Sequence, residues 1–146
     1  MFVHRYRVAF YDTDAMRVVH HANYIRIMEC ARVEWLRQLD LIKYHTPHGS
    51  HVWAITHVKV DFLKSAVFDD EIETVLEGRL VGARFQIRYA LWVERLKAYV
   101  AVGETDLVPL VAETLQATRF PLEARERLRN LAWSDVWPPA APPPRP

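Results

Sequence analysis

The chain has 146 residues, 51% of them apolar, which is enough for one domain with a hydrophobic core. Its 19 basic and 18 acidic side chains give a formal net charge of +1, so the charge gives no reason to expect wholesale binding to nucleic acid or to an anionic membrane. The single cysteine, Cys30, cannot form an internal disulfide, and the first residues lack the apolar run of a signal peptide. We therefore expect a cytoplasmic protein with no nucleic-acid partner and no membrane insertion.

The N-terminal part of the chain predicts a strand, a loop and one long helix. Residues 2–10 read as a strand, and residues 11–17 as the loop that follows it. Apolar side chains then recur every three or four residues from Ala22 to Leu39, which is the period of a helix. The segment Thr46–Ser50 contains a proline and a glycine, and both disfavour continuing a helix, so we expect a linker there.

The second half of the chain predicts an antiparallel meander. Alternating apolar and polar residues predict strands at Val58–Phe62, Ile72–Leu80, Phe85–Val93 and Tyr99–Val108, with turns at Asp69–Asp70 and Glu94–Lys97. A last strand is expected over Glu113–Arg119, and Pro121 suits the first turn of a short helix that runs to Leu131.

The end of the chain differs in composition from the rest. Six of the nine prolines lie between Pro138 and Pro146, so we expect this segment to be extended or disordered and to dock to nothing. We divide the chain into one domain over residues 1–132 and a proline-rich tail over residues 133–146.

One long helix and a meander of about five strands predict an α+β fold. In such a fold a curved antiparallel sheet wraps around the long central helix. A single sheet leaves two open edges, and pairing them between copies of the chain would cover them. We therefore expect a homo-oligomer.

The segment Tyr11–Arg32 carries the residues of most chemical interest. It ends a strand, turns through Asp12 and Asp14, and enters the long helix beside His20 and His21. Unpaired amides at a helix N-terminus can hold a developing oxyanion, while a nearby carboxylate activates water or attacks directly. This layout suits hydrolysis of an activated acyl group.

Short motifs in this segment are followed by others downstream. They are Asp12-Thr13-Asp14, Val18-Val19-His20-His21, Asn23-Tyr24 and Glu29-Cys30-Ala31-Arg32, and then Val60–Ala66, Asp69–Ile72, Ala101–Val108 and Thr118–Pro121. In this order they resemble hotdog-fold acyl-CoA thioesterases of the 4-hydroxybenzoyl-CoA thioesterase type, which include the short-chain acyl-CoA thioesterases found near the Tol–Pal genes. The resemblance spans Val3 to Leu131. It implies a hotdog fold, hydrolysis of acyl-CoA to free acid and CoA, a dimer or a homotetrameric dimer of dimers, and no cofactor apart from the CoA of the substrate.

The resemblance places the family's catalytic aspartate on Asp14, and the residue at the helix start that polarises the thioester carbonyl on His21. We hypothesise that the His21 backbone amide holds the thioester oxygen while Asp14 either deprotonates water or forms a transient mixed anhydride. The family usually has glycine where this chain has Arg17. If that glycine serves a left-handed backbone, Arg17 must follow another path or accept strain, and its side chain could reach the acyl pocket or the CoA phosphates.

Other candidates have a structural interpretation beside the functional one. Tyr24 is a candidate substrate contact, although Tyr11 and Tyr24 are both expected to pack rather than to donate protons. Glu29 is a candidate second acid in the pocket, and an ion pair with Arg32 is the simpler account. Cys30 is expected in the core rather than as a nucleophile. Asp14 itself could simply cap the helix or satisfy loop amides, and we assign Asp12 to structure.

The remaining polar candidates concern phosphates and metals. Lys64, Arg84 and Arg88 could bind the CoA phosphates across an interface, or be merely solvated. The pair His20–His21 with Asp14 could suggest a metal site, but we expect adjacent side chains at a helix start to diverge, and no third histidine has ligand spacing to them. We therefore expect no metal.

Two other functions stay open. One is a hydratase or dehydratase of the same architecture, acting on acyl-CoA or on an acyl carrier protein, with His21 as a base. The other is a non-catalytic subunit that binds acyl-CoA, with Arg17 as the feature that favours it and the tail as a contact for a partner.

Overall fold

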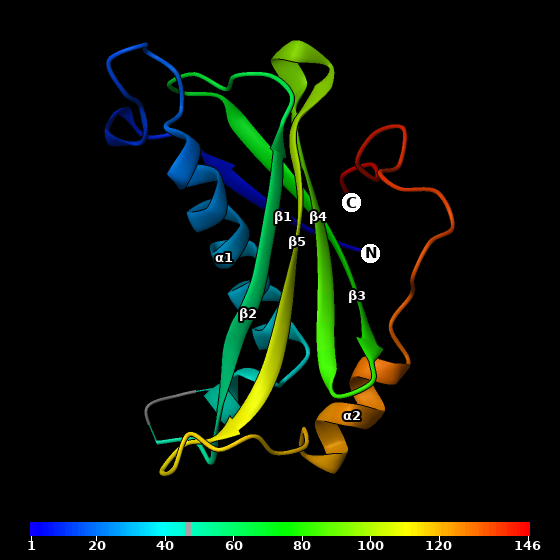
Figure 1. Cartoon of the computed structure of the whole chain (residues 1–146). Coiled ribbons are helices and arrows are strands. Elements are labelled where there is room, and N and C mark those ends of the chain that lie inside the picture. Colours follow the sequence, from blue (N-terminus) through cyan, green and yellow to red (C-terminus); the bar gives the residue numbers. More distant parts are fainter. Residues whose placement is uncertain (46–47) are drawn as a thin grey trace.

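A computed structural model describes residues 1–45 and 48–146, which form a five-stranded antiparallel sheet with two α-helices (Figure 1). The elements are β1 (Phe2–Arg7), η1 (Phe10–Asp12), α1 (His21–Gln38), η2 (Ile42–His45), β2 (His51–Phe62), β3 (Glu71–Val81), β4 (Arg84–Val93), η3 (Glu94–Leu96), β5 (Ala98–Val111) and α2 (Leu122–Arg129). The strand order is β1-β3-β4-β5-β2, and all neighbours are antiparallel. The predicted α+β class is confirmed. The meander is confirmed only for β3, β4 and β5, because β2 pairs with β5 at the edge of the sheet rather than with β3.

Helix α1 lies along one face of the sheet (Figure 1), with contacts to β1 and β3. Its buried residues follow the helical period: Tyr24, Ile27, Met28, Ala31, Trp35 and Leu36. They meet the apolar face of β4, where Phe85, Ile87, Tyr89 and Leu91 are all fully buried. The sequence pattern predicted this face of β4 and, on α1, the buried Met28, Ala31 and Trp35. It also placed Ala22 and Ile25 on the buried face, where both are exposed.

Two parts of the predicted secondary structure are wrong. The first strand ends at Arg7 rather than at Phe10, because the Asp12 carboxylate accepts a hydrogen bond from the Ala9 amide (2.8 Å) and folds residues 10–12 into a 3₁₀ turn. The expected strand over Glu113–Arg119 is instead a turn and a loop. Leu115 adopts a left-handed φ of 56°, and this stretch makes only an isolated bridge, to the end of β5.

Two strands are also longer than expected. Strand β2 begins at His51, at the end of the predicted linker Thr46–Ser50, of which residues 46 and 47 lie outside the described residues. Strand β5 continues to Val111 and pairs with β2 over the length of β2, apart from one register shift between Ile55 and His57. This long pairing leaves the far side of β2 as one open edge of the sheet.

The C-terminal tail contains neither helix nor strand, as expected, but it packs against the sheet. The rings of Trp133 and Trp137 enclose the guanidinium of Arg88 on β4, at 3.8 and 4.3 Å. Ser134 donates to Glu77 on β3 through its hydroxyl (2.5 Å) and its amide (2.9 Å). Because Arg88 alternates with residues that face α1, the tail lies on the opposite face of the sheet, over β3 and β4. The expectation that the segment from Pro138 to Pro146 docks to nothing was wrong too, because Arg145 within it forms an ion pair with Glu71 on β3.

Candidate functional site

The loop between β1 and α1 is organised around a buried carboxylate. Asp12 is 1% exposed and accepts hydrogen bonds from the Tyr6 hydroxyl (2.7 Å), the Ala9 amide (2.8 Å) and the guanidinium of Arg26. Its backbone oxygen accepts from the Asn23 side chain (2.8 Å) and so joins the loop to the first turn of α1. Asp12 thus has the structural place that the sequence suggested.

Asp14 lies two residues further along, in a tight turn. Its Oδ1 accepts from the Met16 amide (2.8 Å), and its backbone pairs with Val18 and Arg17. Among the described residues, no protein group donates to its Oδ2. One carboxylate oxygen therefore holds the turn, and the other is left for a ligand.

Arg17 occupies a left-handed backbone conformation, with φ at 62°. A side chain in this region crowds the following carbonyl, which is why glycine is favoured there. The sequence left open whether Arg17 avoids this conformation or accepts its strain. In the structure Arg17 adopts the conformation and accepts the strain.

A cavity of about 620 Å³ opens beside Asp14. It is lined by Phe10, Tyr11, Thr13, Asp14, Arg17 and Phe68. Phe10 and Phe68 meet edge to face, 5.8 Å between ring centroids. Tyr11 is 82% exposed at this cavity, so its expected packing role was wrong. The structure thus brings Asp14 and Arg17 together beside an aromatic wall, which suits an apolar acyl group next to a carboxylate.

Helix α1 begins beside this loop. His20 caps it, with Nδ1 accepting from the Ala22 amide (3.1 Å) and its carbonyl accepting from the Asn23 amide (2.8 Å). The amide of His21 has no acceptor among the described residues. An unpaired amide at the positive end of the helix dipole is a suitable donor for an oxyanion.

The two histidine side chains at the start of α1 do not diverge as expected. Their rings stack, with centroids 4.1 Å apart. The exposed ring of His21 also meets Phe62 edge to face at 6.3 Å. Within the described residues, no three His, Cys, Asp or Glu side chains gather as a metal site would require.

Tyr24 has a packing role at the same end of the molecule. Its side chain is 3% exposed, its hydroxyl accepts from the Ala66 amide (3.0 Å), and burial raises its pKa above the usual value. Its ring meets Phe62 at 5.6 Å. Phe62, half-exposed at the end of β2, joins His21 and Tyr24, but sequence reasoning treated it only as an apolar strand residue. Its position at the end of a strand gave no signal of this contact.

The loop before β3 is hydrogen-bonded to Val19, just before α1, and to Tyr24 in its first turn. Its Ala66 accepts from the Val19 amide (2.9 Å) and donates to Tyr24. Asp70 accepts from the Val67 amide (2.9 Å) and binds Arg95 through two bonds of 2.8 and 2.9 Å. Burial by itself raises the pKa of Asp70, but Arg95 and the amide outweigh it and hold the pKa below its usual value. The ionised carboxylate therefore fixes the loop at neutral pH.

The other predicted site residues do not converge on Asp14. Glu29 is exposed on α1, and the expected ion pair with Arg32 is absent from the described residues, since Arg32 donates to the buried Tyr89 hydroxyl (3.3 Å). Cys30 is half-buried rather than part of the core.

The three basic candidates for phosphate binding are dispersed. Lys64 follows β2 and is exposed. Arg84 forms an ion pair with Asp106 (3.0 Å), and Arg88 is held between the tail and Glu77. They do not form one phosphate site within this chain.

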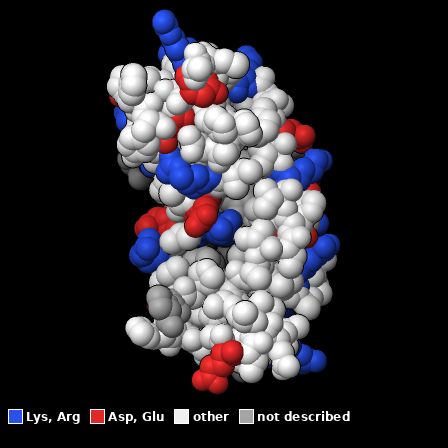
Figure 2. Space-filling view, turned by 60° about the vertical axis from the view of Figure 1, so that its left-hand side comes forward, with Lys and Arg blue, Asp and Glu red and all other residues white. Residues whose placement is uncertain are grey.

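Two further observations concern the charges on one face of the molecule and the hydropathy of the helices. Figure 2 shows basic and acidic side chains scattered among uncharged surface rather than gathered in one patch. Neither helix of the described part of the chain is long and apolar enough to cross a membrane.

Comparison with known proteins then identifies the family. The model of the thioesterase-like superfamily matches residues 8–128. The chain belongs to the thioesterase-like superfamily. The match covers the Asp14 loop, α1 and four of the five strands in full, and it ends inside α2, so the tail lies outside it.

Two relatives match the chain over most of its length. An acyl-CoA thioesterase, YbgC, of Haemophilus influenzae is 28% identical over 130 residues, 86% of this chain and 92% of that protein. A 1,4-dihydroxy-2-naphthoyl-CoA hydrolase of Thermosynechococcus vestitus is 37% identical over 117 residues, 78% of this chain and 79% of that protein. The family resemblance predicted from the sequence is confirmed.

The solved structures agree on the fold. The crystal structure of Slr0204, a 1,4-dihydroxy-2-naphthoyl-CoA thioesterase from Synechocystis, superposes with a TM-score of 0.80 at 20% identity, over 87% of this chain and 94% of that one. The chain therefore has the fold of the hotdog thioesterases.

Proposed function

We propose that this protein hydrolyses acyl-CoA thioesters to the free acid and CoA. The observation that carries the proposal is the Asp14 carboxylate, which lines an aromatic-walled cavity on the loop leading into α1. At the start of that helix the amide of His21 has no acceptor within the described part of the chain. In this proposal α1 is the central helix that the sheet wraps. Membership of the thioesterase-like superfamily and the names of its relatives support the same reaction.

The proposed mechanism uses two groups, the Asp14 carboxylate in the loop and the His21 amide at the start of α1. The thioester oxygen accepts from the His21 amide, which stabilises negative charge as the carbonyl carbon becomes tetrahedral. Asp14 either takes a proton from water or attacks the carbonyl itself to give a mixed anhydride that water then opens. The sulfur leaves as the CoA thiolate in both routes, and no cofactor other than the CoA of the substrate takes part. The stacked ring of His21 orients the attacking water.

The same proposal includes oligomerisation through β2. This strand is an open edge, and Ile55, Val58 and Phe62 are apolar side chains exposed along it. Pairing of β2 with β2 of a second copy would cover the edge and its apolar side chains. We propose a homodimer built on this edge, which associates further into a homotetramer and acts in the cytoplasm.

Thiol release from short, medium, long and aromatic acyl-CoA esters tests the reaction. We expect release by the native protein and a fall in kcat of at least about 100-fold in Asp14→Asn, since the amide neither accepts a proton at neutral pH nor attacks. The matched control is Asp135→Asn, an exposed carboxylate in the tail, which should keep native kcat. Native turnover by a folded Asp14→Asn variant would contradict the role of Asp14.

One observation favours a second candidate, a subunit that binds acyl-CoA without hydrolysing it. Arg17 places a strained, charged side chain at the cavity where the family usually has glycine. Detectable binding of acyl-CoA with no thiol release from any ester would establish this function instead of hydrolysis.

A further inference from the structure

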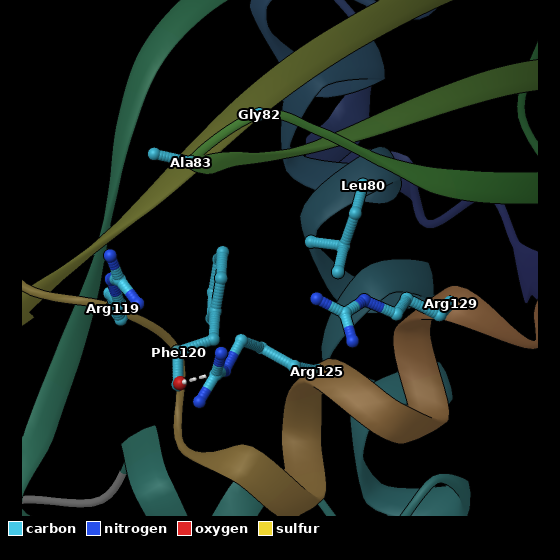
Figure 3. Close-up of a pocket in the computed structure, with 7 residues that line it drawn as sticks. All are labelled: Leu80, Gly82, Ala83, Arg119, Phe120, Arg125 and Arg129. Carbon is cyan, nitrogen blue, oxygen red and sulfur yellow. Dashed lines mark hydrogen bonds between the residues drawn. The ribbon is translucent and has the colours of Figure 1, made fainter.

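A second cavity, of about 520 Å³, lies at the other end of the molecule and is bordered by three arginines (Figure 3). Arg125 and Arg129 are one helical turn apart on α2, and Arg119 precedes that helix. Figure 3 shows their guanidinium groups placed around the ring of Phe120. The cavity is thus cationic on the side formed by α2 and the segment before it.

These three charges are not neutralised by the protein. Among the described residues, none of the three forms an ion pair, and no Asp or Glu lines the cavity. Arg125 donates only to the Phe120 carbonyl (3.0 Å). Of the two acids of α2, Glu123 is turned to Tyr44 (2.6 Å) and Arg127 (2.7 Å), and Glu126 is exposed and forms no ion pair within the described part of the chain. Three like charges around one cavity repel one another, and a bound anion would remove that cost.

The rest of the lining is apolar and open. Leu80 and Ala83 give the cavity accessible apolar surface, whereas Phe120, 3% exposed, closes its floor. Gly82 in the β3–β4 turn has φ at 61°, and its missing side chain would meet nothing within 4 Å. The cavity therefore offers apolar surface to a flat or carbon-rich group beside three guanidinium groups.

Guanidinium groups bind phosphate oxygens through paired hydrogen bonds, and Arg is favoured over Lys where such geometry matters. A ligand with two or more phosphate groups on a ring system matches both parts of the lining. We propose that this cavity binds a nucleotide phosphate, with the phosphates at Arg119, Arg125 and Arg129 and the nucleoside against Leu80 and Ala83.

The nucleotide has two sources, a free nucleotide or the nucleotide end of an acyl-CoA substrate. Figure 1 shows α2 and the β3–β4 turn at the opposite end of the sheet from the start of α1. Strand β3 alone spans about 33 Å between these ends, at about 3.3 Å per residue. Antiparallel pairing of β2 with β2 of a second copy would reverse one chain and bring its cavity to the Asp14 end of the other. The substrate source therefore rests on the proposed function and its dimer, and the free source does not.

Direct binding of adenosine 3′,5′-bisphosphate, which has no thioester, tests the site by calorimetry. We expect one molecule to bind per chain, with an affinity that falls as salt is raised. The side chains of Arg119 and Arg129 make no hydrogen bond or ion pair with other described residues, so the double variant Arg119→Gln/Arg129→Gln should keep the fold and raise the Kd at least about tenfold. Arg37→Gln, an exposed arginine of α1, is the control and should bind as the native protein does. Failure of the native protein to bind, or equal binding by the double variant, would overturn the site.

Steady-state kinetics then separate the two sources. For the substrate source, the double variant raises KM for acyl-CoA about tenfold at unchanged kcat and leaves hydrolysis of an S-acyl-N-acetylcysteamine, which lacks the nucleotide, unaltered. For the free source, KM for both esters is native while the loss of bisphosphate binding persists. If the native protein releases no thiol at all, hydrolysis fails as the proposed function, and the calorimetric result still decides the nucleotide site.

Discussion

At the scale of single residues, Arg17 shows how a site residue can be marked by its backbone. The sequence indicated that this position suits glycine, and the structure gives Arg17 a left-handed φ of 62°. A non-glycine residue in this conformation costs about 1–2 kcal/mol. The strain lies on the turn that also holds the carboxylate of Asp14, because the Arg17 amide donates to the Asp14 carbonyl (2.9 Å).

Replacing Arg17 should therefore separate strain from charge. Arg17→Gly removes both the strain and the side chain, whereas Arg17→Ala removes the charge and keeps the strained φ. We expect the glycine variant to exceed the alanine variant in free energy of unfolding by about 1 kcal/mol. Urea denaturation of both variants measures the difference. Equal stability of the two would mean that the turn relaxes to another conformation when the arginine is removed.

The residues of the loop were predictable to different degrees. Asp12 and Asp14 were distinguished from the sequence only by their place in the motif, and the structure places one in a buried network and the other at a cavity. Phe68 reaches the same cavity from a loop more than fifty residues away. A contact of this kind depends on tertiary structure, and no local spacing encodes it.

At the scale of elements, the spacing between α1 and the sheet depends on glycine in β5. A Cβ added at Gly103 would lie 2.8 Å from the Lys59 carbonyl oxygen of β2 and 2.9 Å from Cε of Met28 on α1. Both distances are shorter than an ordinary van der Waals contact. The methionine end can move, but the strand backbone cannot move without disturbing its ladder.

Gly103→Ala should therefore destabilise the fold by about 1–3 kcal/mol, the usual range for overpacking. The measurement is the free energy of unfolding of this variant, of Met28→Ala and of the double variant. We expect a favourable coupling between the two sites, because the shorter side chain relieves one of the two close contacts. If the two effects on the free energy of unfolding are additive, the destabilisation by Gly103→Ala comes from the β2 backbone alone. If Gly103→Ala is as stable as the native protein, α1 does not pack as closely on β5 as described.

Helix α1 and strand β4 were predictable because their buried residues recur at the period of a helix and of a strand. The stretch from Glu113 to Arg119 was mistaken for a strand because propensity alone supported it, and the left-handed Leu115 breaks it. The tail was misjudged for a different reason. Composition describes its prolines, but the two tryptophans that fix it bind a strand residue 45 or more positions earlier.

At the scale of the whole molecule, the tail covers the β3–β4 part of the face of the sheet that α1 leaves open. Glu77 is 1% exposed beneath it. Burial by itself raises the pKa of Glu77, but the hydroxyl and amide of Ser134 and the guanidinium of Arg88 outweigh burial and keep the pKa below its usual value. Ser134 of the tail thus supplies hydrogen bonds to a buried ion pair of the sheet, although the tail lies beyond the part of the chain that matches the family.

Trp133 is the residue through which this contribution can be measured. Its ring covers both Arg79 (4.1 Å) and Arg88 (3.8 Å). Trp133→Ala should lower the free energy of unfolding by about 1–3 kcal/mol, through lost apolar burial and two lost cation–π contacts. Val136→Ala changes a side chain of the same segment that is 74% exposed, so it should leave stability within about 0.5 kcal/mol of native. Thermal denaturation of the two variants, together with a chain ended after residue 132, ranks them. If Trp133→Ala and Val136→Ala both unfold at the temperature of the native protein, the tail is not held on the sheet in solution. If the chain ended after residue 132 also unfolds at that temperature, the domain over residues 1–132 is stable by itself.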